Sequence, residues 1–194
     1  MSSPARHLHY TYAEYLALEE LSPTRHEYLD GEIYAMAGGT PDHAALAATV
    51  IGILRASSPR GCRVFTSDLR VRIAASGLST YPDVAVVCGP SVRAADDPLA
   101  VVNPTLLVEI TSPSTEDYDR GEKLRHYQQL PGLGQVLIVS HREARITSFR
   151  RGDDGRWTST EARAGETVTL GGLGGTLSVD DVYRDGLEDA SRPS

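Results

Sequence analysis

The sequence predicts an α/β (α+β) fold in which helices flank a mixed central β-sheet. Helical and strand patterns alternate along the chain, and residues 105–141 read as one strand–helix–strand unit. Two short apolar runs, YPDVAVVC and TLLVEITS, are typical of strands buried on both faces. The chain has 194 residues, 40% of them hydrophobic, which is enough for one sizeable core. We therefore expect a single domain over residues 10–186, with flexible ends at 1–9 and 187–194.

Local signals place the elements of the N-terminal half. A capping-box pattern, T-x-x-E at 11–14, predicts a short helix. The Asp-Gly pair at 30–31 lies between two short runs and predicts a β-hairpin. Thr-Pro at 40–41 predicts the start of a longer helix, and the Ser-Pro pair at 58–59 ends it.

The second half continues with strands before and after one helix. Strand propensity, proline and glycine positions predict the following order: two strands or one bent strand over 62–74, a loop over 89–103, a helix over 117–130, paired strands over 134–141 and 142–151, then short antiparallel strands and a terminal helical turn.

Charge and cysteine content exclude several classes of protein. With 26 acidic and 19 basic residues the net charge is −7, which argues against a protein that coats nucleic acid by bulk attraction. Two cysteines are too few for a disulfide framework or a thiolate zinc site, so a reducing compartment fits. Neither a membrane-spanning run nor the apolar core of a secretory signal is present in the sequence. We expect a cytoplasmic protein without a membrane partner.

Two carboxylates interrupt the buried strands. Asp83 follows Pro82 at the start of one strand, and Glu109 has apolar neighbours on both sides in the other. A buried carboxylate costs several kcal/mol unless it is paired or bound to a metal. Two of them on neighbouring strands would repel unless a cation lay between them, and magnesium prefers such oxygen ligands. The alternatives are a buried salt bridge to arginine or a strand end that faces solvent.

The single lysine is a second unusual feature. Eighteen of the 19 basic residues are arginine, and Lys123 is the exception. Asp119, Lys123 and Tyr127 are four residues apart in the predicted helix, so they share one face. A strand–helix crossover turns that face toward the sheet, where the lysine could reach the carboxylates. The alternative is an exposed Asp–Lys pair of little energetic weight.

These residues together form a recognisable pattern. The Pro-Asp pair at 82–83 followed by LLVEITSPSTEDYDRGEKLRHYQQ resembles the Uma-type restriction endonuclease family of the PD-(D/E)XK nuclease superfamily. HEYLDGEIYAM, a helix that begins near His43, and the closing GLGGTLSVDDVY also match, so the resemblance covers about residues 10–186. It implies a restriction-endonuclease-like core.

The resemblance also implies roles for individual residues. Asp83 and Glu109 would be catalytic and bind a divalent metal, usually magnesium with manganese possible, and the Ile110 carbonyl could add a ligand. Thr111 stands where the usual motif has lysine, so Lys123 of the following helix would orient water or stabilise the transition state. Further residues that could belong to the site are Glu27, His43, Asp119 and Tyr127.

The function implied by the resemblance is a metal-dependent endonuclease that hydrolyses phosphodiester bonds in DNA, with a homodimer as the expected assembly. The acidic balance is a departure, since DNA contact needs basic surface. Two arginine groups could provide it: Arg60, Arg63, Arg70 and Arg72, or Arg142, Arg145, Arg150 and Arg151. The alternatives are a non-catalytic nucleic-acid-binding or regulatory protein, and a metal-binding interaction protein. An intact Asp83–Glu109–Lys123 cluster favours the enzyme, whereas a buried arginine partner favours a structural role.

Overall fold

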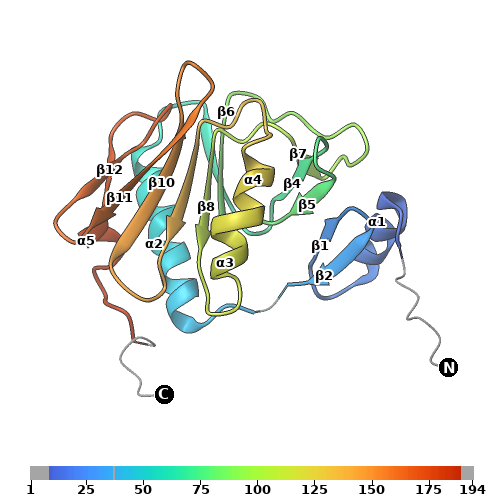
Figure 1. Cartoon of the computed structure of the whole chain (residues 1–194), viewed down its shortest axis with the longest axis horizontal. Helices are drawn as coiled ribbons and strands as arrows, with labels where there is room; N and C mark the ends of the chain where they lie inside the picture. Colours follow the sequence, from blue (N-terminus) through green and yellow to red (C-terminus); the bar gives the residue numbers. More distant parts are fainter. Residues whose placement is uncertain (1–8, 37, 189–194) are drawn as a thin grey trace.

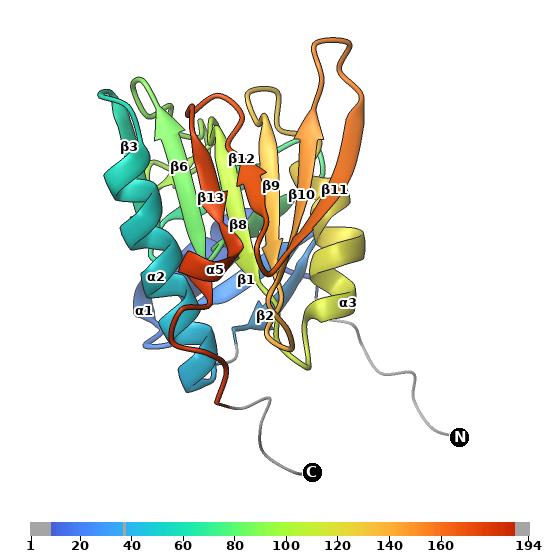
Figure 2. The same cartoon turned by 90° about the vertical axis from the view of Figure 1, so that its left-hand side faces the viewer.

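The computed structural model describes residues 9–36 and 38–188. Its strands form a five-stranded sheet in the order β2-β1-β5-β4-β7, a six-stranded sheet in the order β11-β10-β9-β8-β6-β3, and the hairpin β12–β13. Helices lie against these sheets (Figures 1 and 2), so the predicted mixed α/β architecture is confirmed. The segments 1–8 and 189–194, which make up most of the two predicted flexible ends, lie outside the described residues.

The five-stranded sheet is built mainly from the N-terminal part of the chain. Its strands are β1 (His26–Leu29), β2 (Glu32–Ala35), β4 (Arg70–Ile73), β5 (Leu78–Thr80) and β7 (Ala100–Val101). The predicted hairpin is confirmed, with positive φ angles of 45° at Asp30 and 91° at Gly31. Helix α1 (Tyr12–Leu21) packs beside it and begins with the predicted capping box between Thr11 and Glu14.

The six-stranded sheet is the centre of the molecule. It contains β3 (Cys62–Thr66), β6 (Val84–Cys88), β8 (Leu106–Ile110), β9 (Gln135–Val139), β10 (Arg145–Arg151) and β11 (Trp157–Arg163). Strands β8 and β9 run parallel, and the segment between them crosses over the sheet as a helix. Every residue of β8 and β9 is buried, which is what their continuous apolar sequences predict.

Each face of this sheet has its own cover (Figure 1). On one face lie α2 (Pro41–Ser57), β12 (Thr167–Thr169), β13 (Thr176–Ser178) and α5 (Val179–Val182), and their apolar side chains pack on Val84, Val86, Leu106 and Val108. The crossover segment covers the other face, where its residues Leu124, Tyr127 and Leu130 pack on Ala85, Leu107 and Val136. Because side chains alternate along a strand, odd-numbered positions of β6 and β8 point toward the crossover helix.

The crossover helix differs from the uniform helix predicted over 117–130. It consists of α3 (Glu116–Tyr118), a π-helical turn η1 (Asp119–Lys123) and α4 (Leu124–Tyr127). A π turn spaces hydrogen bonds five residues apart and widens the helix at that point. The helix thus ends three residues before the predicted boundary and has an irregular turn in the segment that contains the lysine.

The segment 62–74 forms two separate strands, β3 and β4, which is the first of the two arrangements predicted for it, and these strands belong to different sheets. The prediction of a loop over 89–103 needs correction, because this segment contains the short strand β7, which pairs in parallel with β4. The sheet membership of β3 and β4 and the presence of β7 come from long-range pairing, which local turn signals do not encode.

The two cysteines form a disulfide between neighbouring strands. Cys62 of β3 lies directly opposite Cys88 of β6, and their sulfur atoms are bonded. The low cysteine count did not predict this pair, because strand register rather than composition brings the two residues together. No helix within residues 9–36 and 38–188 has the length and apolar character needed to cross a bilayer.

Candidate active site

The two buried-strand carboxylates lie side by side on the face covered by the crossover helix. Val84 pairs with Val108 in the antiparallel β6–β8 ladder, so Asp83 lies next to Glu109. Asp83 Oδ2 accepts a hydrogen bond of 2.7 Å from the Ile110 amide, which holds the carboxylate at the end of the β6–β8 strand pair where β6 begins and β8 ends. Glu109 is only 3% exposed. The adjacent position of the two acids is therefore a direct consequence of strand register.

Lys123 places its ammonium group among three carboxylates. Its Nζ atom lies 3.0 Å from Glu27 Oε1, 3.1 Å from Glu109 Oε1 and 3.8 Å from Asp119 Oδ1. The side chain is buried, with 5% of the residue exposed. Among the described residues, no arginine forms an ion pair with Asp83 or Glu109, so the structural alternative of a buried Arg–carboxylate pair is not what the chain adopts.

Glu27 reaches the cluster from the other sheet. It lies on β1, and the Thr80 hydroxyl of neighbouring strand β5 donates a hydrogen bond to its Oε1 atom. This carboxylate therefore connects the N-terminal sheet to Lys123 on the crossover helix. The Glu27 position depends on packing between segments nearly 100 residues apart in sequence, from 27 to 123.

Tyr127 serves both the core and the cluster. Its ring is fully buried in the core under the crossover helix, while its hydroxyl donates a hydrogen bond to Glu109 Oε1. A phenol in this position holds the glutamate side chain toward Lys123. Asp119, Lys123 and Tyr127 are all buried and face the sheet, in agreement with their spacing along the helix.

His43 approaches Asp83 from the first turn of α2. Its Nε2 atom lies 3.3 Å from Asp83 Oδ2. The hydrogen bond to Asp83 raises the pKa of His43, and a backbone hydrogen bond to Ile110 raises it further, although burial opposes both. The raised pKa favours a charged ring beside the Asp83 carboxylate.

Burial and like charges dominate the electrostatics of the cluster. Burial raises the pKa of Glu109 to about 8; the charge of Lys123 lowers it, and those of Asp83 and Asp119 add to the rise. Burial also raises the pKa of Asp119, against the charge of Lys123. Burial lowers the pKa of Lys123, but the surrounding groups, Glu109 first, outweigh it and hold the pKa well above its ordinary value. The lysine is therefore a permanent cation at neutral pH.

A cavity of about 540 Å³ opens onto the cluster. Its charged part is formed by Glu27, Asp83, Glu109, Asp119 and Lys123. Its remaining walls come from the end of the hairpin, the turn before α2, and the segment that precedes the crossover helix: Tyr34, Ala35, Met36, Gly38, Gly39, Thr40, His43, Tyr81, Ile110, Ser112, Pro113, Ser114, Thr115 and Tyr118. The acids and the lysine are thus accessible to a small ligand or an extended chain, unlike those of a closed salt-bridge cluster.

The donor set suits magnesium better than zinc. Asp83 Oδ1 and Glu109 Oε2 accept no hydrogen bond from any described residue, so each acid keeps one free oxygen. Within residues 9–36 and 38–188, no three His, Cys, Asp or Glu side chains form a group that could hold a metal ion by themselves. Magnesium usually takes only one or two carboxylates and keeps several waters, whereas zinc takes three or four protein ligands. Two adjacent carboxylates with free oxygens therefore fit a hydrated magnesium ion.

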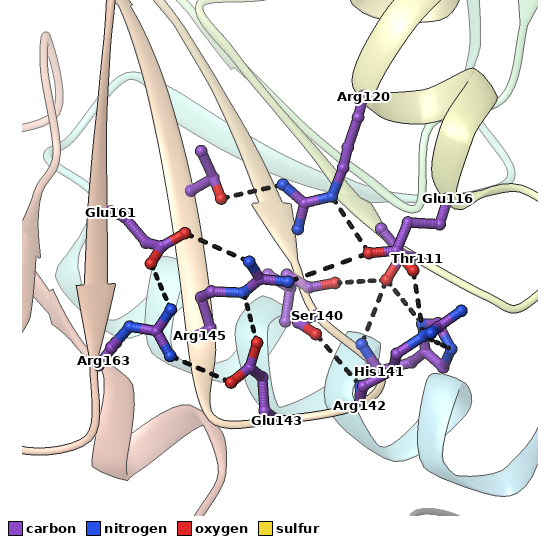
Figure 3. A network of polar contacts seen from close by, with 12 residues as sticks. Thr111, Glu116, Arg120, Ser140, His141, Arg142, Glu143, Arg145, Glu161 and Arg163 are labelled. Carbon is purple, nitrogen blue, oxygen red and sulfur yellow. Dashed lines mark hydrogen bonds and ion pairs between the residues drawn. The ribbon is translucent and has the colours of Figure 1, made fainter.

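An ion-pair network fixes the start of the crossover helix (Figure 3). The Glu116 carboxylate lies 3.3 Å from Arg120 Nε, 3.1 Å from Arg142 Nε and 4.0 Å from Arg145 Nη2. Arg145 continues the network to Glu143 and Glu161, which also hold Arg163. The network joins α3 to the β10–β11 hairpin, and so it helps to hold the turn that carries Asp119 and Lys123.

Most members of the two predicted arginine groups are paired with acids or carbonyls, and the other three, Arg60, Arg63 and Arg150, are exposed. Arg70 and Arg72 are buried; Arg70 lies 2.6 Å from Asp97 and Arg72 lies 3.2 Å from Asp96. Arg63 lies on β3, which belongs to a different sheet from the β4 strand that carries Arg70 and Arg72. In the second group, Arg142 and Arg145 are paired with glutamates. Arg151 donates to three backbone carbonyls.

Sequence reasoning missed two kinds of residue at the site. Thr80 and Tyr118 contact or line the cluster, and Glu116 anchors its helix. Tyr118 is next to Asp119 in the sequence, but the π turn that brings it to the cavity has no local sequence signal beyond Gly121. Thr80 and Glu116 act through partners on distant strands, and no local pattern identifies such partners.

Comparison with known proteins agrees with this geometry. The model of the Uma2 family, described as "Putative restriction endonuclease", matches residues 12–180. The chain belongs to the Uma2 family. Two Synechocystis proteins described as uncharacterized are similar to this chain. The slr1290 protein is 37% identical over 172 residues, covering 88% of this chain and 90% of that protein, and the sll1609 protein is 32% identical over 152 residues, covering 78% and 86%.

A solved structure extends the comparison to the fold. An Anabaena variabilis protein described as a putative nuclease belonging to DUF820 superposes with a TM-score of 0.69 at 17% identity, covering 84% of this chain and 92% of that one. At this identity the similarity concerns the fold. The Uma2 match and the shared fold together support a nuclease, as the sequence pattern implied.

Proposed function

We propose that the protein is a metal-dependent endonuclease that hydrolyses phosphodiester bonds in DNA. The observation that carries the proposal is the cluster at the cavity floor, where Asp83 and Glu109 each keep a free carboxylate oxygen beside the buried ammonium of Lys123. An acid pair with an adjacent fixed cation is suited to phosphodiester hydrolysis, because negative charge develops on the phosphate oxygens during the reaction. Nuclease chemistry is also the activity named for the family.

Asp83 and Glu109 would hold the divalent cation through their free oxygens. When bound, magnesium or manganese would stabilise charge on the phosphate and lower the pKa of a water molecule. The Ile110 carbonyl is the third predicted ligand, and Ile110 lines the same cavity as the two acids. Glu27 faces Lys123 and the Thr80 hydroxyl, and its proposed role is to position the lysine.

Lys123 would stabilise the transition state as a donor. Its high pKa keeps the ammonium charged, so it cannot accept a proton from water near neutral pH. Contacts with Glu27 and Glu109 fix the Nζ atom, and a fixed charge costs no reorganisation when the reaction proceeds. Tyr127 supports this arrangement by holding Glu109.

One observation favours the non-catalytic alternative. The chain carries a net charge of −7, and many of its arginines are committed to internal acids or carbonyls. A protein of this charge would bind duplex DNA weakly without divalent cations. DNA rather than RNA as the substrate, a homodimer and a cytoplasmic location remain predictions.

The experiment is cleavage of plasmid and oligonucleotide substrates with magnesium or manganese. We expect wild-type cleavage, loss of cleavage in Asp83→Asn, and a loss on the order of 10²–10³ in both Lys123→Ala and Lys123→Arg, since the bulkier planar guanidinium cannot take the place of a compact point charge. Magnesium at ten times its dissociation constant should stabilise the wild type by about 1.4 kcal/mol but not Asp83→Asn. Metal stabilisation without cleavage of DNA or RNA would favour the non-catalytic alternative, and the absence of both would count against a metal site.

A further inference from the structure

Tyr118 lines the same cavity, and its hydroxyl has no hydrogen-bond partner among the described residues. The side chain is partly buried, and the charges of Glu27, Lys123 and Asp119 act on its hydroxyl. The Tyr118 hydroxyl is not fully buried, so it is open to the cavity, where a ligand can replace the water that it would otherwise bind. The hydroxyl is therefore available to a ligand in the cavity.

Other tyrosines around the cluster differ from Tyr118 in this respect. The hydroxyls of Tyr127, Tyr81 and Tyr34 all donate to carboxylates, which are those of Glu109, Glu19 and Glu32. Tyr118 has acids nearby but donates to none of them. Among these four tyrosines, Tyr118 is therefore the one whose hydroxyl donates a hydrogen bond to no described residue.

The π turn explains why Tyr118 and Lys123 lie on the same side of the helix. The two residues are five positions apart, and in a regular α-helix of 3.6 residues per turn they would point about 140° away from each other. Tyr118 directly precedes the turn over Asp119–Lys123, where the hydrogen-bond spacing is itself five residues. The widened turn brings both side chains to the cavity, and π turns of this kind are frequent at functional sites.

We propose that the Tyr118 hydroxyl donates a hydrogen bond to a non-bridging oxygen of the scissile phosphate. The inference rests on the proposed nuclease function and adds a substrate-binding residue to it. Four carboxyls line this cavity and repel a phosphate, so a donor that is not already bound to an acid is the group that a phosphate oxygen can use. Burial raises the pKa of Tyr118, and the charge of Glu27 raises it further, so the phenol keeps its proton and acts only as a donor.

The test is Tyr118→Phe, which removes one oxygen atom and nothing else. We expect the melting temperature to stay unchanged, because the hydroxyl has no protein partner to lose, and kcat/KM to fall about 10- to 100-fold, as for a hydrogen bond to a charged acceptor. Tyr34→Phe is the control variant, since it removes the oxygen of a cavity phenol that already donates to Glu32. Its kcat/KM should fall less than that of Tyr118→Phe.

A phosphorothioate substrate separates binding of the phosphate from a structural role. Sulfur accepts hydrogen bonds weakly, so in one of the two diastereomers at the scissile position the contact is already lost. On that diastereomer, Tyr118→Phe and the wild type should then have nearly the same cleavage rate. On the oxygen substrate, Tyr118→Phe should still be slower than the wild type. An equal defect on the oxygen substrate and on both diastereomers, or no defect at all in an enzyme that cleaves, overturns the inference alone. A wild-type protein that cleaves no nucleic acid overturns the proposed function, and this inference with it.

Discussion

Replacement of Lys123 by methionine tests whether the buried cation holds the acid cluster together. The ammonium contacts Glu27, Glu109 and Asp119, and no other lysine or arginine among the described residues pairs with these three acids. Methionine has a similar length and fills the same space without charge. The substitution therefore isolates the loss of the cation from the loss of packing.

The magnitude follows from the burial of the pair. Lys123 is 5% exposed and Glu109 is 3% exposed, so water at the cavity screens the two charges only weakly. Removing one partner of a buried ion pair costs about 3–5 kcal/mol, because the other charge is left uncompensated. For a chain of this size 1 kcal/mol corresponds to about 2–4 °C, so we expect the melting temperature to fall by about 6–20 °C at pH 8.

The loss should depend on pH with a definite sign. Burial and like charges raise the pKa of Glu109 from 4.5 to about 8 in the folded protein. Its protonated form thus stabilises the fold, a contribution that is complete below pH 4.5 and lost as the pH rises through 8. Removing Lys123 raises the pKa of Glu109 further, since the lysine charge opposes the shift. The destabilisation should be smallest near about pH 5 and grow toward pH 9, because every acid that ionises does so without its cation.

The assay is urea or thermal unfolding in EDTA at several pH values. Arg125→Met is the matched control, since it removes an exposed cation from the next helical turn; it should change stability by no more than about 0.5 kcal/mol. Adding Glu109→Gln to Lys123→Met should recover part of the loss. Equal losses in the two single variants, or a Lys123→Met loss that does not change with pH, would refute the reasoning.

Two further predictions concern structural contacts away from the cavity. Burial raises the pKa of Asp97, but hydrogen bonds from Arg70 and Tyr12 outweigh it and leave the pKa below 3.8. Asp97→Asn should therefore lower the free energy of unfolding by about 3 kcal/mol near neutral pH. In acid unfolding, the difference between variant and wild type should disappear as the pH falls below 3.8. A difference that persists at that pH would contradict the pairing of Asp97 with Arg70. The Cys62–Cys88 disulfide closes a loop with a sequence separation of 26, so reduction should lower the unfolding free energy by about 3 kcal/mol. The double Cys→Ser variant should have the same stability as the reduced protein, and adding reductant should not change it. An unchanged melting temperature of the wild type on reduction would show that the disulfide does not contribute to stability.

Elements with strong local signals could be predicted from the sequence. The capping box at Thr11, the Asp30-Gly31 turn and the Thr40 N-cap each specify their own backbone geometry through one or two side chains. The parallel β8–β9 pair also follows from the sequence, because a strand–helix–strand unit of this length has few other arrangements. These predictions depend on residues close together in the chain.

Features that depend on distant partners could not be predicted. The pairing of Arg70 with Asp97 joins residues 27 positions apart, and both are common surface residue types. The Cys62–Cys88 bond depends on the register of two antiparallel strands. The π turn has no known local signal beyond Gly121 within it. In each case the deciding energy comes from tertiary packing, which single-sequence patterns do not contain.

The same distinction applies to the cluster. Asp83, Glu109 and Lys123 stood out because a charge in an apolar strand, or one lysine among 18 arginines, is unusual by itself. The contact between Lys123 and Glu27 was not visible in this way, since Glu27 is one of several acids in an ordinary hairpin. Only the family resemblance pointed to it. The catalytic roles of all these residues stay predictions until variants are assayed.

The imbalance of charge at the cavity is the strongest argument that it serves more than stability. Glu27, Asp83, Glu109 and Asp119 line the same space as one lysine and one histidine. A cluster that only stabilised the fold would match each buried acid with a cation or replace it with apolar groups of similar volume. Burial raises the pKa of Glu109, the charges of Asp83 and Asp119 raise it further, and the excess of acids repels anions. A divalent cation would relieve both effects at once, so cation binding and phosphate entry should be linked, and each should become stronger in the presence of the other.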